Sequence, residues 1–300
     1  MRMTRNFRRP LLLLAAGVAV LGTLTACSPL GALNALSPSG GADAVTDIAY
    51  GSAPRLKLDI YRPAKATPNA PVVVFFYGGN WNSGERKDYA FVGRALASRG
   101  IIAVIPDYRL YPQVSYPDFL DDSAQAVAWT AKHAAEYGGN PNSLFVMGHS
   151  AGAYNAAMVA LDGRWLGKQG ATPGVLAGWI GLAGPYDFLP IENENVKPVF
   201  HFPNTPPESQ PVNHLNGKKL PALLIAANND RLVNPKRNTG GLAERLRGHG
   251  VAVTEVYYDG VSHATLVGSI ATPLRGLAPT LDAVDRFVHD NASLSKVQAM

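Results

Sequence analysis

The chain has 300 residues, of which 47% are hydrophobic and 16% are charged, with a single cysteine and a formal net charge of +5. Four of the positive charges are arginines near the N-terminus and no acidic residue precedes Asp43, so the rest of the chain carries only about +1. This balance argues against a nucleic-acid-binding protein and against a strongly anionic substrate, and a lone cysteine excludes an internal disulfide.

The N-terminal segment has the pattern of an export signal. Arginines at positions 2, 5, 8 and 9 precede an apolar run over residues 11–24, which is short for a membrane-spanning helix and typical of a signal-peptide core. The run ends in Leu24-Thr25-Ala26-Cys27, which resembles a bacterial lipoprotein signal. We therefore expect residues 1–26 to be a signal peptide and Cys27 to carry lipid; an incidental cysteine or an uncleaved anchor helix are the alternatives.

The segment 27–46 is rich in Ser, Pro, Gly and Ala, which predicts a flexible tether between the lipid and the folded part. Several acyl chains on Cys27 would hold a protein on a membrane stably, whereas one chain binds only marginally. Ser28 stands where many lipoproteins retained at an inner membrane have aspartate. We therefore expect a lipid-anchored protein of the bacterial cell envelope, at the outer membrane or the periplasmic face.

Beyond the tether, predicted strands alternate with predicted helices. Residues 56–61 alternate apolar and polar side chains, as a half-exposed antiparallel strand does, whereas 72–76 is continuously apolar, as a strand covered on both faces is. Further buried strands are expected at 101–105, 144–147, 175–182, 222–227 and 251–258, and helices at 88–98, 117–136, 151–161, 240–247 and 274–289. This order predicts one α/β domain over 47–292, with a mostly parallel sheet, helices on both faces and an antiparallel N-terminal edge. The Pro- and Asn-rich segment 185–217 is expected to be a lid or binding loop.

The pentapeptide Gly148-His149-Ser150-Ala151-Gly152 matches the nucleophile elbow G-x-S-x-G. It follows a predicted strand and precedes an Ala-rich predicted helix, which is the order that the elbow requires. Small residues flank the serine because a strained turn leaves no room for larger side chains. Ser150 is therefore the candidate nucleophile.

A serine hydroxyl needs an imidazole as base and a carboxylate that orients it. His263 follows the strand at 251–258 and Asp230 follows the strand at 222–227, both where sites collect in parallel sheets. Asp187 is the alternative acid, and His201 and His214 in the long loop are weaker rivals for the base. The order Ser150, Asp230, His263 is the order of the α/β-hydrolase triad.

The developing oxyanion needs backbone N–H donors. One is expected from Ala151, directly after the nucleophile, and others from Gly78 and Gly79, which follow the strand at 72–76. Two glycines allow the backbone to approach a substrate closely.

Three motifs together resemble those of α/β-hydrolase esterases related to hormone-sensitive lipase and to the bacterial feruloyl-esterase-like and kynurenine-formamidase-like groups. They are Gly78-Gly79-Asn80-Trp81, which resembles the HGGxW oxyanion motif, Asp107-Tyr108-Arg109-Leu110 with Pro112 and Pro117, and the elbow. Tyr77 stands where that pattern has histidine, so the way this chain holds its oxyanion loop cannot be transferred from the family.

The resemblance implies the α/β-hydrolase fold and a serine esterase that cleaves small-molecule carboxylic esters through an acyl-enzyme on Ser150. An amide or arylformamide hydrolase with the same triad is the alternative, and a non-catalytic binding scaffold is a second. No cofactor and no metal are expected, because the sequence holds no HExxH, no phosphate loop and no Cys/His cluster. The sequence makes no prediction about oligomeric state.

Overall fold

A computed structural model describes residues 28–65 and 67–298, with side chains up to residue 292. The expected signal peptide and Cys27 lie outside the described residues. The strands are β1 Ala42–Ala49, β2 Lys57–Pro63, β3 Ala70–Phe76, β4 Ile102–Pro106, β5 Gly139–His149, β6 Leu176–Leu182, β7 Ala222–Ala227 and β8 Val253–Tyr258. The helices are α2 Pro29–Leu36, α3 Ala90–Ala97, α4 Asp118–His133, α5 Ala151–Leu161, α6 Gly163–Lys168, α7 Gly241–Gly248, α8 His263–Gly268 and α9 Thr280–Gln298, and the short 3-10 turns include η1 Arg86–Tyr89 and η8 Thr272–Leu274.

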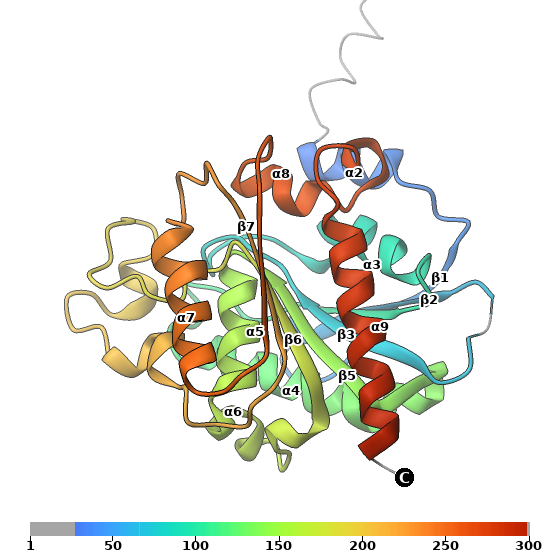
Figure 1. The fold of residues 1–300 in the computed structure, drawn as a ribbon, viewed down its shortest axis with the longest axis horizontal. Helices are drawn as coiled ribbons and strands as arrows, with labels where there is room; N and C mark the ends of the chain where they lie inside the picture. The colour runs from blue at the N-terminus through green and yellow to red at the C-terminus, as the bar shows by residue number, and fades with distance from the viewer. Residues whose placement is uncertain (1–27, 66, 299–300) are drawn as a thin grey trace, which may run out of the picture.

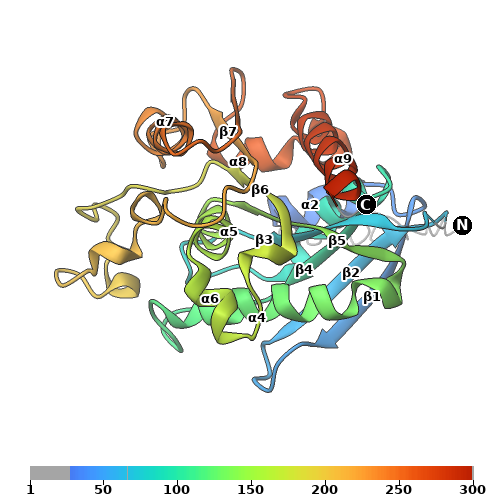
Figure 2. The ribbon, with the colours of Figure 1, turned by 60° about the horizontal axis from the view of Figure 1, so that its bottom comes forward.

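All eight described strands form one sheet in the order β1-β2-β4-β3-β5-β6-β7-β8 (Figure 1). The pairs β1–β2 and β2–β4 are antiparallel, and every other pair is parallel. Helices α3 and α9 pack together on one face, and α4, α5 and α6 pack together on the other (Figure 2). The structure thus confirms a mostly parallel sheet with helices on both faces and an antiparallel N-terminal edge.

The buried centre of the sheet follows from the apolar runs in the sequence. Every residue of β3, β4 and β7 is buried, as expected for strands that helices cover on both faces. The last strand, β8, is an edge strand whose residues are half-buried or exposed, so the expectation of a buried strand there was wrong. An apolar run does not reveal whether a strand has one neighbour or two.

The outer strand β2 is more buried than its alternating pattern suggests. Asp59, expected on a half-exposed face, is 1% exposed because it accepts a hydrogen bond from the buried Arg86 guanidinium. Tyr61 packs against Gly93 of α3, where an added Cβ would collide with the tyrosine ring. A polar residue at an alternate position can therefore lie inside when it has a charged partner.

Residues 28–46, expected to be a flexible tether, instead contain helix α2 and the start of β1. Ser28 caps α2, since its hydroxyl accepts from the Gly31 amide, and Pro29 occupies the first helical position. The Asn34 side chain donates to the carbonyls of Lys87 and Asp88 and accepts from the Phe91 amide. These contacts hold α2 against η1 and α3, so this part of the chain is a folded element.

The segment 185–217 contains three short 3-10 turns, Pro198–Phe200, Pro207–Ser209 and Pro211–Asn213. Helix α9 begins at Thr280 rather than at residue 274, after the turn η8. In the described part of the chain no helix is both long and apolar enough to cross a bilayer.

Candidate active site

Ser150 stands between β5 and α5 with a positive φ of 54°, a conformation that is strained for a residue with a side chain. Its amide donates to the Leu182 carbonyl on the neighbouring strand β6 at 2.9 Å. A Cβ on Gly148 would overlap the backbone at Gly152, and a Cβ on Gly152 would overlap the Phe76 carbonyl at the end of β3. Both glycines are therefore required by close backbone contacts, as the elbow pattern predicts.

Asp230 and His263 meet at the carboxyl ends of β7 and β8. His263 Nδ1 lies 2.7 Å from Asp230 Oδ2, and the amides of Leu232 and Val233 donate to Asp230 Oδ1 at 2.8 and 3.0 Å. Burial alone would raise the pKa of Asp230, but the hydrogen bond and charge of His263 and the two amides outweigh it and lower the pKa. An ionised Asp230 fixes the proton of His263 on Nδ1, which leaves Nε2 unprotonated and free to accept a proton.

The rival candidates lie elsewhere. Asp187 pairs with Arg237 at 3.0 Å rather than with a histidine. His201 Nε2 lies 2.7 Å from the Tyr116 carbonyl, and His214 Nε2 lies against the Glu208 carbonyl. Neither histidine lines the cavity that contains Ser150 and His263.

His149 makes a contact that the sequence did not predict. Its Nε2 lies 2.9 Å from the His263 carbonyl, so the nitrogen is the donor, and the two imidazole rings are 4.9 Å apart. Burial, followed by the charge of His263, lowers the pKa of His149 to about 3, so its ring is neutral. The side chain next to the nucleophile thus supports the backbone of His263.

The oxyanion loop lies directly over the nucleophile. A Cβ on Gly78 would be 3.0 Å from the Ser150 Cβ, and Gly79 has a φ of +125°, which a side chain would strain. Asn80 and Trp81 follow with positive φ values of 51° and 57° and, like Ala151, line the cavity. Asn80, which the sequence analysis did not single out, is a further candidate for contact with substrate.

Tyr77 holds this loop from its buried side. Its hydroxyl donates to Asp107 at 2.8 Å and accepts from Arg55, and its ring stacks between Tyr89 and Tyr108. The Tyr108 hydroxyl in turn donates to the Tyr77 carbonyl at 2.8 Å. Burial, with smaller contributions from Tyr108 and Asp107, raises the pKa of Tyr77 well above its usual value, so the phenol remains a donor. Tyr77 therefore holds the loop and does not face the cavity.

An ion cluster, buried except for Asp47, lies under the same loop. The Arg86 guanidinium, on a side chain that is 6% exposed, pairs with Asp47, Asp59 and Asp107, and the Arg86 amide also donates to Asp107. Arg55 pairs with Asp107 more weakly, at 3.8 Å, and donates to the Gly84 carbonyl. We call Asp47, Asp59, Arg86 and Asp107 the Arg86 cluster; it ties the oxyanion loop to β1, β2 and the end of β4.

The catalytic candidates open into a cavity of about 290 Å³. Part of its lining is apolar: Trp81 packs on Phe188 and Phe200 and donates through its indole to Asn155 at 2.9 Å. Its outer wall consists of residues from the segments 185–196 and 231–238, and includes the pair Asp187–Arg237. The long loop thus contributes one wall of the cavity, with Asp187 and Phe188 among its lining residues.

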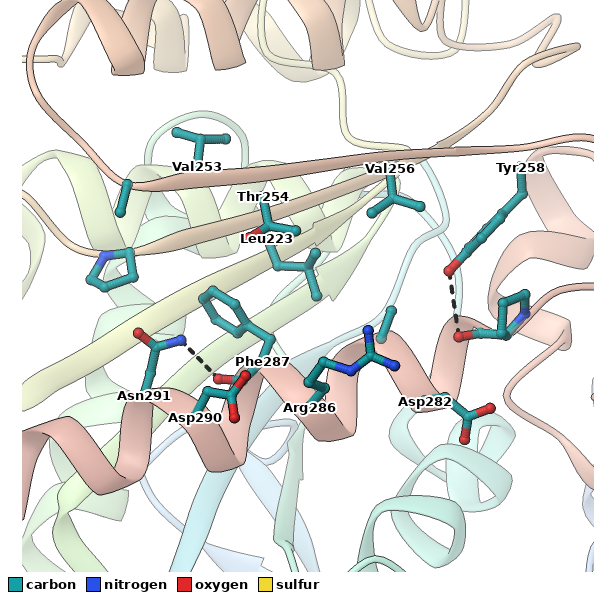
Figure 3. A pocket seen from close by; sticks show the side chains of 14 residues that line it. Leu223, Val253, Thr254, Val256, Tyr258, Asp282, Arg286, Phe287, Asp290 and Asn291 are labelled. Atoms are coloured by element: carbon teal, nitrogen blue, oxygen red, sulfur yellow. Dashed lines mark hydrogen bonds between the residues drawn. The ribbon is translucent and has the colours of Figure 1, made fainter.

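A larger hollow of about 610 Å³ lies between the edge strand β8 and α9, as Figure 3 shows. Val256 of β8 points toward α9, where Phe287 lies, and Asp282 and Arg286 of α9 are also among its lining residues. It contains neither Ser150 nor His263, and it lacks a nucleophile–base pair, so the chemistry belongs to the smaller cavity. Within residues 28–65 and 67–298, no group of three or more His, Cys, Asp or Glu is arranged to hold a metal ion.

Known proteins resemble this chain in sequence and in fold. A probable isoprenylcysteine alpha-carbonyl methylesterase (ICMEL1) of Arabidopsis thaliana is 29% identical, covering 76% of this chain and 52% of that protein. A probable carboxylic ester hydrolase (LipM) of Mycobacterium tuberculosis is 31% identical, covering 67% of this chain and 51% of that protein. The chain therefore spans about half the length of these curated relatives.

The solved structure of an inhibited esterase B from Lactobacillus rhamnosis superposes with a TM-score of 0.74 at 19% identity, covering 96% of this chain and 98% of that one. This likeness and the sheet order establish the α/β-hydrolase fold. The family model BD-FAE matches residues 58–246, which is more than half of the chain and includes Gly78, Ser150 and Asp230. The chain therefore belongs to the BD-FAE family.

Proposed function

We propose that this protein is a serine hydrolase that cleaves carboxylic esters. The observation that carries the proposal is the Asp230–His263 hydrogen bond, which leaves His263 Nε2 available in the cavity that the strained elbow of Ser150 also lines. Relatives described as a methylesterase and as a carboxylic ester hydrolase support an ester as the substrate.

In the proposed reaction, Ser150 Oγ attacks the ester carbonyl carbon while His263 Nε2 accepts the serine proton. Backbone N–H groups of Gly78, Gly79 and Ala151 stabilise the oxyanion. His263 then gives the proton to the departing alkoxide, which leaves as an alcohol, and an acyl-enzyme remains on Ser150. Water, deprotonated by His263, attacks the acyl-enzyme and releases the carboxylic acid. Asp230 keeps the imidazole in the required tautomer throughout.

An amide or arylformamide is the second substrate class, since the same groups could expel an amine. The apolar side chains of Trp81 and Phe188 in the cavity suit acyl or aryl groups in either class. Parallel kcat/KM measurements on matched aryl esters and aryl amides distinguish the two, and we expect the ester to be faster because an alkoxide leaves more readily than an amine.

A fluorophosphonate probe tests the serine directly. We expect the wild-type protein to be labelled at Ser150 and Ser150→Ala to remain unlabelled while keeping its circular dichroism spectrum. A folded wild-type protein that takes up no label would contradict the proposal and favour a binding scaffold.

We further propose that the protein is a lipoprotein, attached through Cys27 to a membrane of the bacterial cell envelope after removal of residues 1–26. The basic start, the apolar run and the Leu24–Cys27 sequence support this. Mass spectrometry of the mature N-terminus should find lipid on Cys27, and Cys27→Ser should leave the protein unprocessed or release it from the membrane fraction. An unmodified Cys27 in a processed, membrane-bound protein would contradict it.

A further inference from the structure

Helix α2 joins the site of lipid attachment directly to the folded domain. Two residue steps separate Cys27 from Pro29, the first residue of α2, and they span at most about 7 Å. Ser28 caps the helix, and Asn34 and Arg94 bind it to the domain: Arg94 donates to the carbonyls of Asn34 and Ser37. A lipid on Cys27 would therefore hold the domain in one orientation, close to the bilayer.

The same helix lies beside the catalytic histidine helix. Leu33 of α2 is 3.7 Å from where a Cβ on Gly268 of α8 would stand, and α8 begins at His263. Figures 1 and 2 both show α2 next to α8. Because β7 and β8 are parallel, the loops after them emerge at this same end of the sheet. The mouth of the cavity and the start of α2 thus share one end of the molecule.

Exposed apolar side chains gather at this end. Four large hydrophobic residues are exposed among the described residues: Leu36, Phe202, Leu232 and Leu277. Leu36 ends α2 and is 65% exposed, Leu277 follows η8, which contacts α2, and is 44% exposed. Leu232, at 76%, lies in the loop after β7 and lines the cavity. The fourth, Phe202, lies in the long loop, away in sequence from α2, η8 and the loop after β7.

We propose that α2, the segment 275–279 and the segment 228–235, together the anchor-side surface, rest on the bilayer, so that the cavity takes apolar esters from the membrane. This inference rests on the proposed ester hydrolase and on the lipid at Cys27. Exposed leucines beside a lipid anchor add buried apolar area at the interface, which strengthens and orients membrane binding. Leu232 at the cavity mouth places the entrance for substrate at the same interface.

The experiment uses the full lipidated chain in phosphatidylethanolamine–phosphatidylglycerol vesicles. One variant carries a 20-residue Gly/Ser insert after Cys27, beginning with serine, which adds about 25 Å of root-mean-square reach. Two esters are compared: a long-chain fluorogenic ester dissolved in the bilayer and a short water-soluble ester. We expect the insert to lower turnover of the bilayer ester at least fivefold (~1 kcal/mol) and to leave the soluble ester unchanged.

Surface variants supply a matched comparison. Leu36→Asp combined with Leu277→Asp should lower turnover of the bilayer ester several-fold, whereas Phe202→Asp, at an exposed apolar residue outside the anchor-side surface, should not. Neither leucine lines the cavity, so turnover of the soluble ester should stay at the wild-type rate. Unchanged turnover of the bilayer ester in both the insert and the double variant would overturn the inference.

Hydrogen exchange on the vesicle-bound protein separates this inference from the proposed chemistry. Amides in the anchor-side surface should exchange more slowly in the wild-type protein than in the insert variant, whether or not the enzyme turns over any ester. Equal exchange rates in the two proteins would overturn only the proposed orientation on the bilayer. Failure of the wild-type protein to cleave the soluble ester would overturn only the proposed hydrolase activity.

Discussion

The two sides of the candidate active site are built in different ways. Below the oxyanion loop, Tyr77 and every member of the Arg86 cluster except Asp47 are buried, and Arg86 and Asp107 each have several partners. On the outer wall of the cavity, the side chain of Arg237 is 42% exposed and pairs with Asp187, whose side chain is 29% exposed. Buried groups that depend on one another resist change, whereas an exposed pair contributes little to stability. The first side therefore fixes the geometry of the chemistry, and the second is free to select substrates.

The largest expected effect separates the two candidate acids, Asp230 beside His263 and Asp187 on the outer wall. Asp230→Asn should lower kcat by about 10⁴-fold with little loss of stability, because the amide favours the wrong tautomer of His263. Asp187→Asn is the matched control and should retain kcat within a few-fold. Steady-state kinetics with a soluble ester measures both, and a reversed order would move the catalytic acid to Asp187.

The Arg86 cluster should show the largest effect on folding. Arg86→Met leaves the buried Asp59 without its cation and Asp107 with only the more distant Arg55, and should reduce the free energy of unfolding by about 3–5 kcal/mol. Arg62→Met removes the ion pair with Asp43, in which both side chains are at least 40% exposed, and should cost less than about 1 kcal/mol. Urea denaturation of both variants measures these losses. Similar losses of unfolding free energy in the two variants would show that the Arg86 cluster stabilises the fold no more than an exposed ion pair does.

His149 should control how stability depends on pH. Its pKa is near 3 in the folded protein and about 6.5 when unfolded, so between these values the unfolded chain binds more protons. The stabilisation is complete above pH 6.5 and is lost as the pH falls toward 3. His149→Gln keeps a donor for the His263 carbonyl and does not titrate, so its unfolding free energy should vary less over this range.

A second variant at the same position tests the support of His263. His149→Leu removes the donor and should lower kcat roughly 10- to 100-fold with little change in KM, whereas His149→Gln should recover most of that loss. If the two variants have equal kcat values, the hydrogen bond to His263 does not position the base.

The smallest effect is expected at the outer wall. Arg237→Ala should change the free energy of unfolding by less than about 1 kcal/mol, because its side chain is largely exposed. It should alter KM several-fold for esters of different shape and leave kcat for a small ester near the wild-type value. A collapse of kcat for every ester would mean that the wall is part of the catalytic machinery.

Local sequence patterns predicted those parts of the site whose residues are close in the chain or end a buried strand. The elbow needed only Gly148, Ser150 and Gly152, and both Asp230 and His263 were found because each follows a predicted strand. Whether these roles hold remains for the variants above to test.

Local sequence patterns did not predict features that depend on distant parts of the chain. The Arg86 cluster joins positions 47, 59, 86 and 107, which come together only through the register of β1, β2 and β4. The contact of His149 with the His263 backbone spans 114 residues. Helix α2 was taken for a tether because its composition is that of a linker, although Ser28-Pro29 is a recognisable helix start.

The contact of Gly152 with the Phe76 carbonyl determines how the protein should lose its activity on heating. The turn that carries the nucleophile packs directly against the end of β3. We therefore expect this turn to unfold only when the central strands β3 and β5 separate. Residual activity and the near-ultraviolet circular dichroism of the buried aromatic residues should therefore decline at the same temperature. Thermal inactivation of this protein would then be the melting of its sheet, with no folded but inactive state before it.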